Sequence, residues 1–155
     1  MGLADHRRTA VSAVRCAVVT ISDTRTEATD TSGRAIVELL EQAGHTVESK
    51  SIVRDEPEQV RTNVGACVGR LDAVITTGGT GIASRDTTCD ALENLFQRRL
   101  DGFGEIFRAL SYHEIGSAAI LTRATAGVVD GTVVFVLPGS ENAVRLGVVD
   151  PDHFT

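Results

Sequence analysis

Apolar and polar residues follow one another along this chain with two different periods. Short apolar or β-branched runs predict strands at residues 15–21, 46–53 and 72–77. Apolar residues between these runs recur with helical spacing and predict two helices, carrying Ile36, Leu39, Leu40 and Ala43 in the first and Val60, Val64, Cys67 and Val68 in the second. Strands that alternate with helices pair in parallel through right-handed crossovers. The pattern therefore predicts an α/β fold, a three-layer α/β/α sandwich with a mainly parallel sheet.

The C-terminal half departs from this parallel pattern once. Asp130-Gly131 separates the apolar runs 125–129 and 132–137, and this dipeptide is typical of a two-residue hairpin turn. Helical patterns supply the remaining elements, from Thr88, over about 103–113, around 117–123 and from Ser140 to about 149. The sheet is thus expected to contain one antiparallel hairpin near the C-terminus.

Small polar residues stand where the predicted helices begin. Ser32 is expected to cap the first helix, and Asp55 the second, which is predicted over residues 55–68. Ser140 is expected to cap the terminal helix.

Length and composition indicate one domain. We expect residues 1–14, which are polar, to form a flexible tail and residues 15–155 to form the domain. No apolar run approaches the roughly 20 residues that a membrane-spanning helix needs, and the N-terminal residues lack the apolar core of a secretory signal. We therefore expect a cytoplasmic protein with no membrane partner.

The charge balance argues against a nucleic-acid partner. The formal net charge is −6 and the isoelectric point is near 5.1, whereas nucleic-acid-binding surfaces show a basic stripe. The pairs Arg7-Arg8 and Arg98-Arg99 are expected to be solvated charges on a tail and on a helix. The three cysteines lack the spacing of a metal site, and we expect them to be reduced.

A glycine-rich loop follows the third predicted strand. Gly78, Gly79 and Gly81 flank Thr80, and the missing side chains let backbone amides approach an anion. The loop lacks the Gly-Lys-Ser/Thr of a Walker loop, and its continuation ends in Ser84, where a dinucleotide fingerprint needs glycine. The sequence therefore predicts a phosphate site of another kind.

Polar residues also follow the other two parallel strands. Ser22-Asp23, Asp55 and residues 78–86 are all predicted at the carboxyl ends of strands, where such folds bind ligands. The Asp86 carboxylate can reach a magnesium ion on bound phosphates. The alternatives are that it pairs with Arg85 or that it lies in a helix-entry turn, where aspartate is common. Asp55 can cap a helix, bind a metal or do both. For Ser22, Asp23, Ser32 and Gly33, turn and cap chemistry is the alternative to ligand binding.

Several short motifs occur in a fixed order over most of the chain. They are Thr20-Ile21-Ser22-Asp23, Asp30-Thr31-Ser32-Gly33, Ile52-Val53-Arg54-Asp55, the loop from Thr76 to Asp86, Gly102-Phe103-Gly104-Glu105 with Phe107-Arg108, Ile120 to Ala124, and Leu137-Pro138-Gly139-Ser140. Together they resemble the molybdopterin adenylyltransferase family, and most closely its MoaB branch.

The resemblance implies that molybdopterin and ATP are the substrates. The terminal phosphate of molybdopterin would attack the α-phosphorus of ATP in the presence of magnesium, giving adenylyl-molybdopterin and pyrophosphate. It implies that Asp55 and Asp86 are catalytic and hold the metal. It also implies substrate or nucleotide contacts for Ser22, Asp23, Ser32, Gly33, Gly78, Gly79, Thr80, Gly81, Pro138, Gly139 and Ser140. The family forms homotrimers or homohexamers, so we expect such an assembly.

A second function stays open within the resemblance. The MoaB branch is compatible with a non-catalytic molybdopterin carrier or scaffold of the same pathway, although the presence of both aspartates favours an enzyme. Two residues depart from the family pattern: Cys89 and Glu141 stand where relatives usually have proline. Cysteine can still begin a helix, whereas Glu141 is expected to alter the rigidity of its loop.

Overall fold

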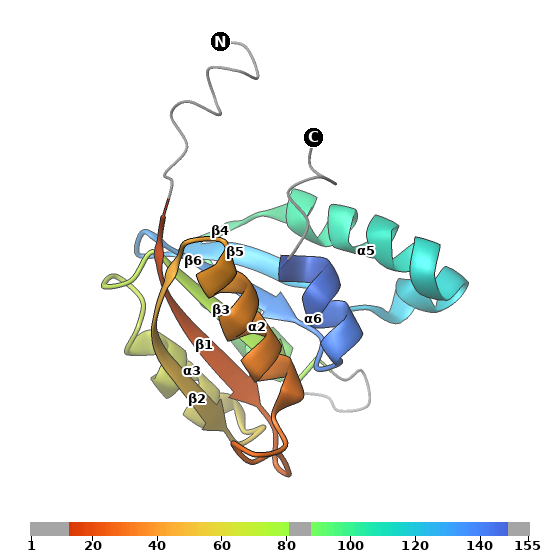
Figure 1. Cartoon of the computed structure of the whole chain (residues 1–155). Coiled ribbons are helices and arrows are strands. Elements are labelled where there is room, and N and C mark those ends of the chain that lie inside the picture. Colours follow the sequence, from red (N-terminus) through yellow and green to blue (C-terminus); the bar gives the residue numbers. More distant parts are fainter. Residues whose placement is uncertain (1–12, 81–87, 149–155) are drawn as a thin grey trace.

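The computed structural model describes residues 13–80 and 88–148, and its centre is a six-stranded sheet of order β2-β1-β3-β6-β5-β4 (Figure 1). The strands are β1 (Arg15–Ile21), β2 (Thr46–Val53), β3 (Ala73–Gly78), β4 (Arg98–Arg99), β5 (Thr125–Val129) and β6 (Thr132–Leu137). The pairs β1–β2, β1–β3 and β3–β6 are parallel, whereas β5–β6 and β4–β5 are antiparallel. The predicted α/β fold is confirmed.

Helices cover both faces of the sheet (Figure 1). One face carries α2 (Thr31–Gln42), α5 (Asp101–Ile115) and α6 (Glu141–Val148), and the other carries α3 (Pro57–Gly65) and α4 (Thr88–Glu93). A 3-10 helix, η1 (Gly116–Leu121), follows α5. The predicted three layers are therefore present.

The alternation of side chains along β1 explains how one strand serves two cores. Cys16 and Val18 pack with Ile36 of α2, whereas Ala17 and Val19 pack with the helices of the opposite face. Every residue of β1 after Arg15 is buried. A strand covered on both faces needs a continuous apolar run, and this is the pattern that identified it in the sequence.

The predicted hairpin is confirmed at Asp130-Gly131. Both residues have positive φ, at 49° and 80°. Two-residue turns with this backbone match the twist of the adjoining strands, and Asp-Gly favours them because glycine and aspartate tolerate the left-handed region. The hairpin joins β5 to β6.

The structure corrects the prediction that Arg98-Arg99 lies on a helix. These residues form β4, because backbone hydrogen bonds from Gln97 N to Val128 O (2.9 Å) and from Leu100 N to Ala126 O (2.8 Å) continue the sheet beyond β5. The Phe96 ring lies over Gly127, where a Cβ atom would come within 2.2 Å of it. Both arginines are nevertheless exposed, as expected.

The second helix is shorter than predicted. It begins at Pro57, a residue favoured at the first helical position, and ends at Gly65, after which single turns lead to β3. Residues 1–12 of the expected tail lie outside the described residues, and Val14 packs against the α2 side of the core. Within the described ranges, no helix has the length and apolarity needed to cross a membrane.

Candidate functional site

A polar pocket of about 290 Å³ opens at the carboxyl ends of β1 and β3. We call it the strand-end pocket. It is lined by Thr20, Ile21, Ser22, Arg25, Asp30, Ser32, Thr77, Gly78, Gly139 and Ser140. Parallel strands end at the same edge of a sheet, and this is why residues predicted from three separate motifs lie together here.

The glycines that begin the loop after β3 are required by close packing. A Cβ atom on Gly78 would come within 2.3 Å of the Ile21 carbonyl oxygen, and one on Gly79 within 2.9 Å of Ile21 Cγ2. Both residues have positive φ, at 93° and 67°, which disfavours any residue with a side chain. Their backbone therefore lies directly against the end of β1.

Asp55 lies beside this loop with a fixed and exposed carboxylate. Its Oδ1 accepts a hydrogen bond from the Thr88 hydroxyl and would lie 3.4 Å from a Cβ atom on Gly79. Its backbone N–H donates to Asp23 Oδ1 at 3.0 Å. The β2 end, the β1 end and the start of α4 thus meet at Asp23, Asp55 and Thr88, which we call the carboxylate cluster.

The prediction that Asp55 caps the second helix is wrong. The N-cap position of α3 is held by Glu56, because Pro57 is the first helical residue, and the Glu56 side chain makes no capping hydrogen bond. The Asp55 side chain is instead directed to Thr88. An exposed carboxylate outside the helix is more available to a cation than a capping carboxylate.

Ser22 organises the turn after β1. Its hydroxyl accepts hydrogen bonds from Thr24 N (3.2 Å) and Arg25 N (3.0 Å). The Arg25 guanidinium donates to Thr29 O (2.9 Å) and Thr31 Oγ1 (3.3 Å), which holds this cation at the pocket wall. The expected turn chemistry of Ser22 is therefore present, and it places a positive charge at the pocket.

The start of α2 is capped by Asp30, which corrects the prediction of a Ser32 cap. Asp30 Oδ1 accepts from Gly33 N at 3.0 Å, and Oδ2 accepts from Thr20 Oγ1 at 2.7 Å. A Cβ atom on Gly33 would lie 2.2 Å from Asp30 Oδ2, so only glycine permits this approach. The Ser32 hydroxyl instead donates to Gly139 O at 2.7 Å and ties α2 to the loop before α6.

Asp30 also forms an ion pair with Lys50 of β2, at 2.9 Å between Oδ2 and Nζ. Burial raises the pKa of Asp30, but the hydrogen bonds from Lys50, Thr20 and Gly33 and the Lys50 charge outweigh it, so the pKa is lowered overall. Sequence reasoning missed this pair. Aspartate three residues before Gly33 is a recognisable capping pattern, whereas the contact with Lys50 depends on the register of β2.

The loop between β6 and α6 closes the pocket. Thr77 Oγ1 donates to Pro138 O at 2.9 Å, and a Cβ atom on Gly139 would lie 3.3 Å from Gly78 Cα. Ser140 Oγ accepts from Ala143 N at 3.1 Å, which confirms the predicted cap of the last helix. The loops after β3 and β6 are therefore in contact.

Gly81 and Asp86, together with Arg85, lie outside the described residues. Thr80 is described and half-buried at the end of the loop. Within residues 13–80 and 88–148, no group of three or more histidine, cysteine or acidic side chains could hold a metal. Asp55 is the predicted metal ligand whose surroundings the structure shows.

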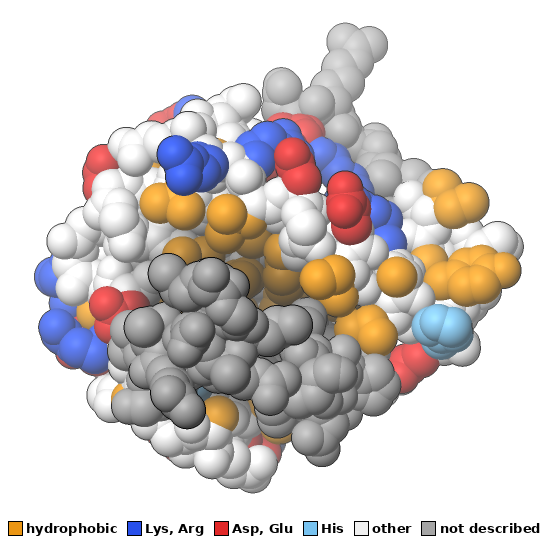
Figure 2. All heavy atoms as spheres, turned by 90° about the horizontal axis from the view of Figure 1, so that it is seen from above, with side chains coloured by type: hydrophobic (Ala, Val, Ile, Leu, Met, Phe, Trp, Pro, Cys, Tyr) orange, Lys and Arg blue, Asp and Glu red, His pale blue; other side chains and the backbone are white. Residues whose placement is uncertain are grey.

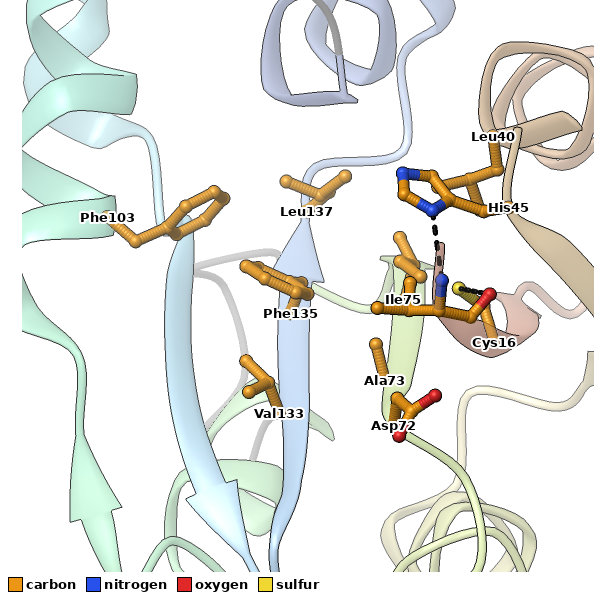
Figure 3. A pocket seen from close by; sticks show the side chains of 11 residues that line it. Cys16, Leu40, His45, Asp72, Ala73, Ile75, Phe103, Val133, Phe135 and Leu137 are labelled. Atoms are coloured by element: carbon orange, nitrogen blue, oxygen red, sulfur yellow. Dashed lines mark hydrogen bonds between the residues drawn. The ribbon is translucent and has the colours of Figure 1, made fainter. Parts of the chain in front are cut away.

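Two other cavities differ from the strand-end pocket. One, of about 340 Å³, contains Glu105 and Arg108, and Arg108 Nη1 donates to Ala124 O at 3.3 Å. The other, also about 340 Å³, is the apolar cavity of Figure 3. It is lined by Val14, Cys16, Leu40, His45, Asp72, Ala73, Ile75, Phe103, Val133, Phe135 and Leu137. Its wall includes the starts of β1, β3 and β6, away from the carboxylate cluster.

Comparison with known proteins decides the family. The family model described as a probable molybdopterin binding domain matches residues 17–150. The chain belongs to this family. The molybdenum cofactor biosynthesis protein B of Bacillus subtilis is 51% identical over 149 residues, covering 94% of this chain and 88% of that protein. This family member therefore acts in molybdenum cofactor biosynthesis.

Two further relatives refine the family match. A protein named molybdopterin adenylyltransferase from Pyrococcus furiosus is 43% identical over 153 residues, covering 95% of this chain and 90% of its own length. A crystal structure of a molybdenum cofactor biosynthesis protein B superposes with a TM-score of 0.84 at 50% identity, covering 89% of this chain and 88% of the other. The resemblance to the MoaB branch is confirmed.

Proposed function

We propose that this family member is a molybdopterin adenylyltransferase. In the proposed reaction, an oxygen of the terminal phosphate of molybdopterin forms a bond to the α-phosphorus of ATP. The bond between that phosphorus and the oxygen leading to the β-phosphate breaks, and pyrophosphate leaves. The 43% identical relative from Pyrococcus furiosus bears this name, which supports the proposal.

The observation that carries the proposal is the exposed Asp55 carboxylate beside the glycine loop. Magnesium binds oxygen ligands, keeps several waters and needs only one or two protein carboxylates when phosphates supply the rest. Asp55 would supply one such carboxylate, and Asp86 is the proposed second ligand. The ion would offset negative charge on the reacting phosphates.

The remaining proposed site residues divide into contacting and positioning groups. The amides of Gly78, Gly79 and Gly81 and the Thr80 hydroxyl would contact phosphate. The residues around the pocket that already hold protein groups would position these contacts: Ser22, Asp23, Ser32, Gly33, Pro138, Gly139 and Ser140. Adenylyl transfer, like other reactions at phosphorus, depends mainly on positioning and charge neutralisation, and the proposed contacts would supply both.

An assembly of three or six copies is also proposed. Tyr112, Ile115 and Ile120 are 60%, 55% and 79% exposed around the end of α5 and in η1. Apolar side chains gather at the right of Figure 2, where α5 lies in Figure 1. Clustered exposed apolar residues favour burial against another chain. Light scattering after size exclusion would report three or six copies, and a monomer at micromolar concentration would contradict the proposal.

The function is tested by pyrophosphate release from ATP and magnesium, with and without molybdopterin. We expect release only with molybdopterin, reduced by roughly 10²–10³-fold in Asp55→Asn because a carboxylate ligand of the magnesium ion that would offset transition-state charge is lost. Glu58→Gln is the matched control, since Glu58 is an exposed acid that pairs with Arg61 on α3. Tight molybdopterin binding without pyrophosphate release would favour the carrier function. The Bacillus subtilis relative is named for the pathway and not for an activity, which is compatible with a carrier.

A further inference from the structure

Lys50, the single lysine of the chain, connects the edge strand β2 to the strand-end pocket. Its side chain is 20% exposed and its Nζ lies 2.9 Å from Oδ2 of Asp30, whose side chain is fully buried. Nζ also lies 3.1 Å from Glu27 Oε2 at the surface. A buried carboxylate is therefore neutralised by a cation that reaches in from the sheet edge.

The strand register explains this reach. Lys50 pairs with Val18, and Thr20 lies two residues further along β1 on the same face, toward α2. Asp30 Oδ2 accepts from both Lys50 Nζ and Thr20 Oγ1, while Oδ1 holds Gly33 N. Asp30 and Thr20 also line the pocket. The charges of Asp30 and Lys50 therefore both contribute to the electrostatic potential in the pocket.

We propose that Lys50 is a positioning residue that offsets the charge of Asp30 and so permits an anion to bind in the strand-end pocket. The inference rests on the proposed function, in which the pocket holds a phosphate group. An unpaired carboxylate in the pocket wall would repel that group, and the repulsion is strong because burial lowers the effective dielectric constant. Arg25 is the one cation among the described residues that line the pocket, and its charge would then have to offset both the carboxylate and the anion.

Two substitutions separate this role from a merely structural one, because they act with opposite sign. Lys50→Met leaves the Asp30 carboxylate unpaired and is expected to weaken anion binding. Asp30→Asn removes the buried partner of the ammonium and leaves the exposed Glu27 as its described ion-pair partner. It keeps a side chain that can cap α2, and it is expected to tighten binding. The double variant is neutral at both positions and is expected to bind as the native chain does. A purely structural pair would weaken binding in both single variants.

The experiment follows backbone amide shifts of Gly33 and Ser140 in the ¹⁵N-labelled full chain as inorganic phosphate is added at pH 8. We expect Lys50→Met to raise the Kd by about fivefold and Asp30→Asn to lower it by about twofold, at low ionic strength. Lys50→Arg, which keeps the charge, should restore native affinity. Arg70→Met is the matched control, because Arg70 forms an exposed pair with Glu48 of β2 at 3.4 Å.

Three results would overturn the inference: no phosphate binding by the native chain, equal affinity in Lys50→Met, or weaker binding in Asp30→Asn. If Lys50→Met does not fold, Asp30→Asn and the double variant decide, and unchanged affinity in Asp30→Asn overturns it. Phosphate binding with the expected signs, but no molybdopterin-dependent pyrophosphate release, would uphold the inference while contradicting the proposed catalysis.

Discussion

The strand-end pocket and the apolar cavity of Figure 3 share strands but differ in almost every contact. The pocket is built from hydrogen-bonded side chains at the ends of β1 and β3, such as Thr20, Ser22 and Thr77. The cavity is built from packed side chains such as Ile75 and Phe135, whose ring meets Phe103 edge-on at 5.2 Å between centroids. Polar contacts position the residues of the proposed site, whereas packing supplies stability.

The largest expected effect comes from the apolar cavity. Ile75→Ala removes a side chain that is 4% exposed and should lower the free energy of unfolding by about 2–5 kcal/mol. The kcat and KM for adenylyl transfer should stay near native at 20 °C. Urea unfolding measures the free energy of unfolding, and initial rates measure kcat and KM. The smaller change Ile75→Val should lower the free energy of unfolding by only about 0.5–1.5 kcal/mol. A loss of activity in the folded Ile75→Ala variant would show that the apolar cavity also determines the geometry of the proposed site.

The second effect lies in the carboxylate cluster. Thr88→Val keeps the side-chain shape but removes the hydroxyl that donates to Asp55. Groups that orient a metal ligand typically contribute about 10–100-fold to activity or metal affinity. We expect a rise of that size in the magnesium concentration needed for half-maximal rate. Native magnesium dependence in Thr88→Val would show that the hydroxyl does not orient Asp55.

The third effect concerns pH, because the pocket contains the Asp30–Lys50 pair. Because the pKa of Asp30 is lowered in the folded chain, its ionised carboxylate stabilises the fold at pH values above its unfolded pKa of about 3.9. This stabilisation is lost as the pH falls through the folded pKa. Lys50 has a raised pKa, because hydrogen bonds and charges from Asp30 and Glu27 outweigh burial, which lowers it. The contribution of Lys50 to folding stability is present below its unfolded pKa of about 10.4 and is lost as the pH rises through the folded pKa.

Lys50→Met should therefore destabilise the chain between these limits, by about 2 kcal/mol for a pair that is partly exposed. Urea unfolding at pH 7 and at acid pH measures this difference, which should shrink once Asp30 is protonated. A difference that stays constant down to pH 2 would contradict the assigned cause.

The smallest expected effect is at Cys89. Burial, followed by the charge of Glu93, raises the pKa of its thiol to about 12, so the thiolate is scarce at neutral pH. Cys89→Ala should leave the adenylyl-transfer rate unchanged, and a thiol reagent at pH 8 should react only after unfolding. Fast labelling of Cys89 in the folded chain would contradict the raised pKa of this thiol.

The sequence predicted elements well where local pattern determines structure. Residues 15–21 and 46–53 match β1 and β2 to the residue, and Asp130-Gly131 predicted its turn from backbone preference alone. By contrast, β4 has two residues, and its existence depends on hydrogen bonds offered by β5. Such an element has no periodicity of its own.

The site shows the same division. Parallel topology was sufficient to bring Ser22, Asp55 and the glycine loop to one edge. It could not assign individual contacts: Asp30 rather than Ser32 caps α2, and Asp55 contacts Thr88 rather than its own helix. The Asp30–Lys50 pair joins residues from different elements through strand register, which no local pattern encodes.

Adenylyl transfer by this chain is tested most directly with ATP labelled at the α-phosphate. The chain, magnesium and molybdopterin are incubated with this ATP, and the label is followed into the pterin fraction. We expect the label to appear in adenylyl-molybdopterin in step with pyrophosphate release, and we expect Asp55→Asn to slow both by roughly 10²–10³-fold. Label that stays entirely in ATP, while molybdopterin remains bound to the native chain, would contradict the proposed catalysis and favour the carrier function.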